Sequence, residues 1–263
     1  MIFYLKSELA PYFNSAKPLF DQLMACEGEL FRDQDGRRTK RIVLGQHTYF
    51  IKQHFGVGYK EIFKNILQGR LPILSAKNEW LALQKLQDLQ ISAPLVVGYG
   101  SRGFNPARLE SFVLMKAIPD AISLEDLAKH WQERAPLFSA KRLLIKRIAS
   151  IAAQMHNNGM NHRDFYLCHF LLPQRHDDLK TAPLFLIDLH RAGLRQQCTR
   201  RWIIKDLAGL YFSSKDLKLT LRDFFYFIKH YRHTNLRAVL RKEKDFWEEV
   251  QQRGDKLYRD HTV

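Results

Sequence analysis

Three charged side chains, far apart in the chain, are of the types that phosphoryl transfer requires. Lys52 lies in the β-prone segment "HTYFIKQH", Asp164 ends the triplet His-Arg-Asp in "NHRDFYLCHFLL", and Asp188 ends the apolar run "APLFLID". A lysine can hold nucleotide phosphates, one carboxylate can orient the attacking hydroxyl and accept its proton, and a second can hold magnesium. The triplet alone is a weak signal, but the order of the three residues is typical of kinases. We predict that Asp164 is catalytic, that Lys52 binds the nucleotide and that Asp188 binds the metal.

His169 stands five residues after Asp164, where a protein kinase has an asparagine that binds a metal ion. A neutral imidazole offers one nitrogen lone pair to a divalent ion, so histidine can replace the amide oxygen. The alternative is a histidine that only packs or forms hydrogen bonds within the loop. We expect His169 to join Asp188 as a ligand of Mg²⁺.

Two further acidic residues are expected to support this machinery. Glu79 opens a predicted helix and is expected to pair with Lys52, as a kinase helix glutamate does, with Glu61 on the preceding helix as the alternative partner. Asp206 lies in a later predicted helix, where we expect it to be buried and to accept hydrogen bonds from the backbone of the loop that carries Asp164. A glycine-rich phosphate loop is absent from the sequence, since "RDQDGRRTKR" stands between the first two predicted strands.

The first part of the chain has the pattern of a mixed sheet and helix lobe. Short β-prone runs separated by Asp-Gly and Gly-Gln turn signals predict three antiparallel strands, and two apolar runs further along predict two more. Two amphipathic segments between them predict helices. The five predicted strands lie in residues 28–54, 93–100 and 110–118, and the helices in 58–67 and 76–91. We therefore predict a five-stranded antiparallel sheet lobe.

After Pro119 the sequence favours helices. Ser123 suits an N-cap, and Asn158-Gly159 suits the end of a helix that begins near residue 141. Further helices are predicted over 201–214, over 219–231 and from residue 235 onward. In the second of these, "LRDFFYFIKHY", Leu221, Phe224, Phe225 and Ile228 have a spacing that favours burial over membrane contact. The predicted fold class is α+β, with a nucleotide-binding lobe over 1–118 and a helical catalytic and acceptor-binding lobe over 119–263.

The composition indicates a basic protein with anionic partners. The 263 residues include 42 Lys and Arg and 27 Asp and Glu, which gives a formal charge of +15. Such a charge attracts nucleic acid, an anionic membrane surface or an acidic substrate, and charge alone does not separate these. The three cysteines lack paired or metal-binding spacing, which favours a reducing compartment, the cytoplasm. Lys6 and Glu8 interrupt the apolar N-terminus, so we expect no secretion signal and at most a peripheral membrane contact.

At this point the chain resembles a known family. The strings "GMNHRDFYLCHFLL", "LIDLHRAGLR" and "RRWIIKDLAGLYFSS" are similar to those of the lipopolysaccharide core heptose(I) kinases, and the likeness covers most of the chain. It implies a protein-kinase-like bilobal fold that transfers the γ-phosphate of ATP to a hydroxyl on heptose I of the lipopolysaccharide inner core. The family's catalytic aspartate maps onto Asp164, its "CHFLL" histidine onto His169 and its "IDLH" aspartate onto Asp188. Many relatives have "HRDCY", whereas this chain has Phe165 beside the catalytic residue.

The resemblance also implies cofactors, partners and a location. We expect ATP and Mg²⁺, a lipid A-core oligosaccharide acceptor, and a peripheral position on the anionic cytoplasmic face of the inner membrane. The alternatives are a kinase of another core sugar such as Kdo, a protein (tyrosine) kinase, and a basic nucleic-acid-binding module on a decayed kinase scaffold. Nucleic acid is not expected, because every charged catalytic position is filled. The sequence does not indicate whether a protein partner is required.

Overall fold

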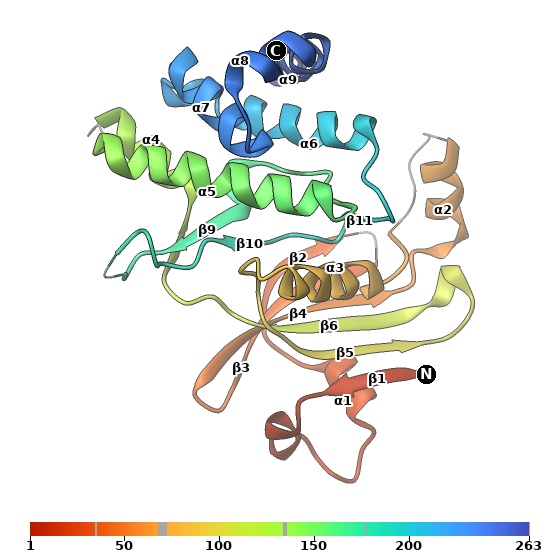
Figure 1. Ribbon diagram of the computed structural model, residues 1–263. Coiled ribbons are helices and arrows are strands. Elements are labelled where there is room, and N and C mark those ends of the chain that lie inside the picture. The colour runs from red at the N-terminus through yellow and green to blue at the C-terminus, as the bar shows by residue number, and fades with distance from the viewer. Residues whose placement is uncertain (35, 68–72, 134–135, 177, 263) are drawn as a thin grey trace. The chain divides into compact units, whose positions relative to one another are not determined.

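The computed structural model describes residues 1–34, 36–67, 73–133, 136–176 and 178–262, without the side chains of residues 61, 65, 66, 132, 133 and 262. The chain divides into two compact units, one formed by residues 1–85 and 94–118 and the other by 86–93 and 119–263. The first unit contains an antiparallel sheet and the second is mainly helical (Figure 1). The predicted α+β class, with a sheet lobe and a helical lobe, is confirmed.

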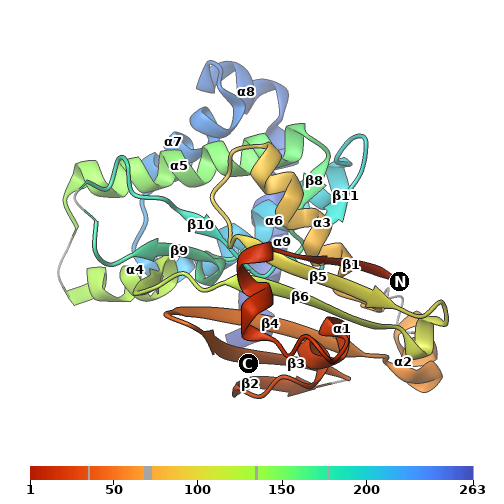
Figure 2. The same ribbon diagram turned by 90° about the horizontal axis from the view of Figure 1, so that it is seen from below.

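The first unit is built on one antiparallel sheet whose strands lie side by side in the order β1-β5-β6-β4-β3-β2 (Figure 2). These strands are β1 (Ile2–Leu5), β2 (Glu29–Gln34), β3 (Arg37–Leu44), β4 (His47–Phe55), β5 (Val96–Arg102) and β6 (Glu110–Lys116). The helices are α1 (Leu19–Ala25), α2 (Gly58–Leu67) and α3 (Lys77–Asp88), with short 3-10 turns at η1 (Ser7–Tyr12) and η2 (Pro106–Arg108). Residues 86–88 at the end of α3 belong to the second unit.

The sheet has six strands among the described residues, and the prediction of five was wrong. The additional strand is β1, which pairs antiparallel with β5 so that Ile2 lies opposite Ser101. Four residues are too few to show a strand period, so this pairing could not be predicted from the local pattern. It satisfies the backbone groups along the edge of β5 and brings Phe3 and Leu5 against the core of the unit.

Alternation along β4 separates the two faces of the sheet. Tyr49, Ile51 and Gln53 are buried on the face that packs against α1, where Gln53 Nε2 donates to the carbonyl of Leu23 at 2.7 Å. Burying an aliphatic side chain such as that of Ile51 contributes roughly 1.5–3 kcal/mol relative to leaving it exposed. Lys52 points to the opposite face, because successive strand residues alternate. One face of β4 therefore packs into the core of the unit, and the other face carries Lys52.

The second unit combines helices with short strand pairs (Figure 1). Its helices are α4 (Leu124–Glu133), α5 (Phe138–Asn157), α6 (Arg200–Ser213), α7 (Leu221–Arg232), α8 (Leu236–Lys242) and α9 (Lys244–Thr262), with 3-10 turns at η3 (Leu167–His169) and η4 (Lys215–Leu217). Its strands are β7 (Ala121–Ser123), β8 (Met160–Asn161), β9 (Phe170–Pro173), β10 (Phe185–Leu186) and β11 (Gly193–Leu194). They form one sheet in the order β10-β9-β7 and a pair of β11 with β8. None of the described helices combines the length and apolar character needed to cross a bilayer.

The ends of α4 and α5 agree with the predicted caps. Ser123 Oγ accepts a hydrogen bond from the backbone N–H of Asp126 at 3.0 Å, as an N-cap does. Gly159, after the end of α5, has φ +74°, and a Cβ there would lie 1.9 Å from the carbonyl oxygen of Arg195. Glycine is therefore required where the chain leaves α5 for β8 and the Asp164 loop.

The predicted burial of the α7 aromatic face was only partly right. Ile228 is buried, but Leu221 and Phe225 are 72% and 38% exposed. The reason is that these side chains, with Phe224, line an open apolar cavity of about 530 Å³ instead of a filled core. The other side chains that line it come mainly from α4, α5, α6 and α9, and all belong to the second unit.

Candidate active site

In the first unit, β4 and α3 bring Lys52 and Glu79 together. Lys52 Nζ lies 2.6 Å from Glu79 Oε1, and the Glu79 side chain is 3% exposed. The next helix residue, Trp80, stacks on Tyr99 of β5 with ring centroids 4.1 Å apart, which fixes α3 against the sheet. The predicted pairing of Lys52 with Glu79 is present, and the side chain of Glu61, the alternative partner, lies outside the described residues. A buried carboxylate of this kind holds the lysine ammonium in one place.

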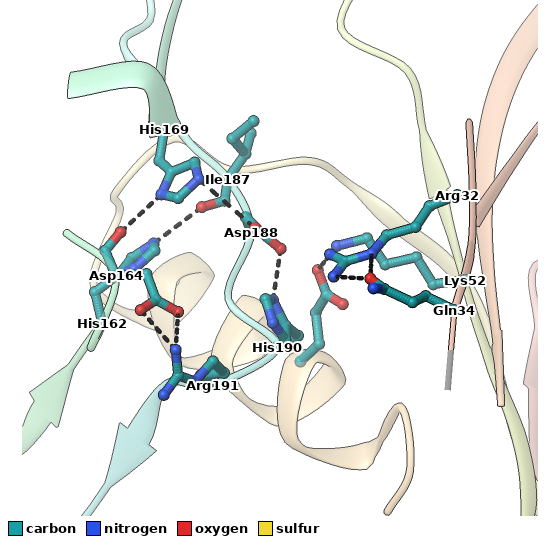
Figure 3. Close-up of polar contacts among 11 residues, drawn as sticks. Arg32, Gln34, Lys52, His162, Asp164, His169, Ile187, Asp188, His190 and Arg191 are labelled. Carbon is teal, nitrogen blue, oxygen red and sulfur yellow. Dashed lines mark hydrogen bonds and ion pairs between the residues drawn. The ribbon is translucent and has the colours of Figure 1, made fainter. Parts of the chain in front are cut away.

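Arg32 of β2 lies on the same sheet face as Lys52, and sequence reasoning missed it. The strand register pairs Arg32 with Thr39 and Thr39 with Lys52, so the three residues form one row across the sheet. Arg32 donates to Gln34 Oε1 at 2.8 Å (Figure 3). The segment that lacks the glycine-rich loop thus contributes a guanidinium to the face that carries Lys52.

In the second unit, Asp206 of α6 holds the loop that carries Asp164. Its carboxylate accepts the backbone N–H of His162 at 2.6 Å and of Arg163 at 2.7 Å, and the residue is 0% exposed. The predicted architectural role of Asp206 is confirmed. Arg163 has φ +74°, a left-handed conformation that costs a residue with a Cβ roughly 1–2 kcal/mol, and these hydrogen bonds help to hold it. The backbone turn at Arg163 sets the direction in which Asp164 leaves the loop.

His162 links this loop to the segment before Asp188. Its Nε2 lies 2.9 Å from the carbonyl oxygen of Ile187, which can only accept, so the ring donates there (Figure 3). Burial lowers the pKa of His162, although the nearby Asp206 acts in the opposite direction. A neutral imidazole is therefore favoured, and its hydrogen bond links the loop that carries Asp164 to the segment before Asp188.

Asp188 and His169 lie together, with Asp164 adjoining through its backbone (Figure 3). His169 Nδ1 donates to the carbonyl oxygen of Asp164 at 2.7 Å, and its Nε2 lies 3.6 Å from Asp188 Oδ2. The other Asp188 oxygen lies 2.6 Å from His190 Nδ1. Because Nδ1 carries the proton donated to the Asp164 carbonyl, the Nε2 atom is the one that faces the Asp188 carboxylate.

One member of this pair is a ligand that magnesium prefers. Mg²⁺ is usually held by one or two carboxylates together with waters and substrate phosphates, so Asp188 Oδ2 fits the ion, whereas His169 Nε2 is a softer nitrogen donor that fits it less well. Among the described residues no cluster of three or more His, Cys, Asp or Glu side chains is arranged as a metal centre. The pair therefore suits an ion that arrives with a nucleotide better than one caged by protein alone.

Arg191 is the second residue that sequence reasoning missed. Its NH1 group donates to both carboxylate oxygens of Asp164, at 2.9 and 3.2 Å (Figure 3). His190 and Arg191 stand two and three residues after Asp188 in "IDLHRAGLR", a string that carried the family resemblance without being examined for roles. The sequence did contain one signal for Arg191, because it is a cationic residue three positions after Asp188, the predicted metal ligand. Asp164 thus has its carboxylate held by Arg191 and its carbonyl held by His169.

Phe165, the residue that departs from the family's common "HRDCY", faces the core. It is 0% exposed, and its ring lies 5.2 Å from that of Phe170 and 5.8 Å from that of His162. The substitution therefore changes packing beneath the loop and not the surface beside the Asp164 carboxylate. The predicted site residues form two groups, Lys52 with Glu79 in the first unit and Asp164, His169 and Asp188 in the second.

Comparisons with known proteins agree on one family. The model of the lipopolysaccharide kinase (Kdo/WaaP) family matches residues 21–231. The chain is 42% identical over 245 residues to a lipopolysaccharide core heptose(I) kinase WaaP of Escherichia coli, covering 92% of this chain and 91% of the relative. It is 40% identical over 250 residues to that of Pseudomonas aeruginosa, covering 94% and 92%. A solved structure described as WaaP in complex with acyl carrier protein is similar at a TM-score of 0.84 and 34% identity, covering 98% of this chain and 100% of that one.

Proposed function

The chain belongs to the lipopolysaccharide kinase (Kdo/WaaP) family, and from this membership we propose that it transfers the γ-phosphate of ATP to a hydroxyl of heptose I in the lipopolysaccharide inner core. The observation that carries this proposal beyond the family is the setting of Asp164. Its carboxylate keeps 15% of its side-chain surface exposed, Arg191 fixes its orientation, and its carbonyl adjoins the His169–Asp188 pair.

Asp164 is the group that orients the acceptor hydroxyl and receives its proton. Arg191 uses one lone pair on each carboxylate oxygen, and each oxygen retains another for the hydroxyl. In the reaction the sugar O–H bond breaks, a bond forms from that oxygen to the γ-phosphorus, and the bond from the γ-phosphorus to the bridging oxygen breaks to leave ADP. The proton passes to Asp164.

The remaining residues bind and orient the donor. Lys52, held by Glu79, contacts the nucleotide phosphates, and the Arg32 guanidinium on the same sheet face assists in place of a glycine-rich loop. Asp188 and His169 would hold magnesium, which when bound neutralises charge on the phosphates. His190 fixes the second oxygen of Asp188 and so keeps the first one directed at His169.

The variant Asp164→Asn tests this assignment. It keeps the shape and a hydrogen-bonding oxygen but cannot accept the proton, so we expect transfer to core-truncated lipopolysaccharide to fall by about 100- to 10,000-fold. The exposed Asp260→Asn is the matched control and should transfer at the wild-type rate. A folded Asp164→Asn protein with near-wild-type turnover would contradict the role given to Asp164.

The acceptor assignment follows the relatives, which are named as heptose(I) kinases. The comparisons favour none of the alternatives, namely another core sugar such as Kdo, a protein tyrosine or nucleic acid. The test is phosphate analysis of core sugars from a strain lacking this gene. Loss of phosphate at heptose I is expected, and loss at Kdo instead would reassign the acceptor. Labelled ATP offered to lipopolysaccharide and protein together separates sugar from protein kinase activity.

An acyl carrier protein is the partner that we propose for this chain as well. The similar solved structure is a complex with that protein, and the cavity in the second unit is lined mainly by apolar side chains, which suits an acyl chain. Size-exclusion chromatography with acylated and unacylated carrier tests the pairing. Co-elution of the acylated form is expected, and failure of both forms to bind would remove the proposal.

We also propose a peripheral position on the cytoplasmic face of the inner membrane. A formal charge of +15 favours an anionic lipid surface, where a lipid-anchored acceptor would lie. Sedimentation with anionic vesicles, lost at high salt and absent with neutral vesicles, is the expected result.

A further inference from the structure

Positive side chains surround one indole in the second unit. Four of them have their charged atoms 4.6–5.6 Å from the centroid of the Trp202 ring on α6, and a fifth, Arg191, lies beside them at Asp164. An aromatic face attracts cations and can hold several around one ring. The cationic cluster consists of Arg163, Arg191, Arg195, Arg201 and Lys205.

This cluster carries more positive than negative charge. The carboxylates that offset it are Asp164, which Arg191 contacts, and the buried Asp206. Within the described part of the chain, no salt bridge joins Arg163, Arg195 or Lys205 to a carboxylate. Burial lowers the pKa of Lys205, and the neighbouring Arg191 lowers it further. Half-buried cations held at this spacing are stabilised when an anion enters among them.

The cluster is built into the fold and not left to mobile side chains. Arg195 NH1 donates to Asn161 Oδ1 at 2.6 Å, across Gly193, where a Cβ would lie 2.3 Å from the guanidinium. Arg163 stacks on Trp202 at 4.6 Å, and its backbone is held by Asp206. The Arg163 Nε atom is buried and has no hydrogen-bond partner among the described residues. The guanidinium groups of Arg163 and Arg195 therefore stand in place before any ligand arrives.

The position of the cluster favours the acceptor over the nucleotide. His169 and Asp188 adjoin Asp164 through its backbone carbonyl, whereas Arg191 contacts its carboxylate, the end at which the acceptor hydroxyl must lie (Figure 3). The cations that serve the donor phosphates in our assignment, Lys52 and Arg32, belong to the first unit.

We propose that the cationic cluster around Trp202 binds a fixed oxyanion of the acceptor, a carboxylate or a phosphate on a sugar near the one that is phosphorylated. The inference rests on the proposed function for the identity of the acceptor. An anion held by Lys205 and the arginines, with the hydroxyl at Asp164, fixes the acceptor at two points and so determines which hydroxyl reacts.

Direct binding tests this without requiring turnover. The probe is deacylated lipopolysaccharide truncated after its first heptose, titrated calorimetrically into the full chain without ATP, in native, carboxyl-reduced and dephosphorylated forms. Lys205→Met keeps the length of the side chain and removes one charge, so we expect it to bind the native probe about tenfold more weakly. Against the probe form that lacks the recognised anion, Lys205→Met and wild type should bind alike, which identifies carboxylate or phosphate as the group.

Controls separate this from general effects of charge and folding. Lys229→Met removes an exposed charge on α7 and should bind like wild type. Arg201→Gln, at an exposed position, should weaken binding in the same anion-dependent way and covers the case in which Lys205→Met is unstable. ATP affinity should stay within twofold in each variant.

Unchanged probe binding by both cluster variants, equal weakening against every probe form, or a loss of ATP affinity instead would overturn the inference. So would a wild-type chain that does not bind the probe. If wild type shows the anion-dependent binding but no transfer to heptose, the proposed function fails and the anion site stands. If wild type transfers phosphate and both cluster variants keep its acceptor affinity, the site fails and the proposed function stands.

Discussion

The substitution Asp206→Asn removes one acceptor from beneath the loop that carries Asp164. In the wild-type chain the two carboxylate oxygens accept separate backbone N–H groups, from His162 and Arg163. An asparagine at the same place offers one oxygen, and its NH₂ group faces the second N–H, donor against donor. The substitution conserves volume, so what it reports is the hydrogen bonding and not the packing.

The size of the effect follows from these contacts. A hydrogen bond to a charged group contributes about 1.5–3 kcal/mol, and a buried donor left unpaired costs a similar amount. One of the two bonds is lost, the other becomes neutral, and the left-handed turn at Arg163 loses part of its support. We expect Asp206→Asn to lower the free energy of unfolding by about 3 kcal/mol. For a unit of this size that is a fall in Tm of about 6–12 °C.

Differential scanning calorimetry with a kinase assay checks both parts of this reasoning. Asp260→Asn, at an exposed position, should leave Tm within about 1–2 °C of wild type. Phosphate transfer by Asp206→Asn should fall even at temperatures where the protein is folded, because Asp164 follows the displaced turn. A variant with wild-type Tm and turnover would show that the loop does not depend on Asp206.

Two further substitutions test individual pairs. Glu79→Gln removes the charge that holds Lys52. We expect the KM for ATP to rise about tenfold while the KM for the acceptor is unchanged. Equal changes in both KM values would contradict the assignment of Lys52 to the nucleotide. Asp223 of α7 is buried beside Lys141, and although burial opposes its ionisation, hydrogen bonds from Lys141 and the α7 cap lower its pKa. Because the folded pKa lies below the unfolded one, this stability is present above about pH 4 and is lost as the pH falls through the folded pKa. Asp223→Asn should therefore be less stable than wild type at pH 7 and approach it in acid, as urea midpoints across pH would show; a difference independent of pH would contradict this.

Much of the architecture could be predicted because it depends on local pattern. Alternation and turn signals indicated the strands of the first unit, and helical spacing with Ser123 and Gly159 as cap signals indicated α4 and α5. The strand β1 could not be predicted, since its stability comes from pairing with β5, about a hundred residues away. The partial exposure of α7 was missed for a related reason. Spacing shows that a helix has an apolar face, but not whether that face meets a filled core or a cavity.

For the site, the sequence indicated residues with a recognisable chemical type and order. Lys52 and Glu79 lie within hydrogen-bonding distance, as do His169 and the Asp164 carbonyl, while their roles stay predictions. Arg191 was missed because arginines are frequent in a chain of charge +15, so one more basic residue carries little information. Its contact with Asp164 follows from the turn after Asp188, whose φ of +62° no local pattern indicates.

One face of α6 explains how the loop and the cationic cluster are positioned together. Trp202, Asp206 and Gly209 are four and three residues apart, a spacing that places them on one side of a helix. The Arg163 guanidinium stacks on the Trp202 ring, and the Asp206 carboxylate accepts a hydrogen bond from the Arg163 backbone N–H. Gly209 leaves room for the next part of the loop, since a Cβ there would lie 3.2 Å from the Phe165 carbonyl oxygen.

The loop therefore rests on α6 through its backbone, with the Phe165 ring buried and the Asp164 carboxylate held by Arg191. Because Phe165 is buried, we expect variation at this position to leave the surface beside Asp164 unchanged. Acceptor choice should depend instead on the residues around Trp202, and a relative that changes Lys205 or Arg201 is the one expected to differ in its acceptor.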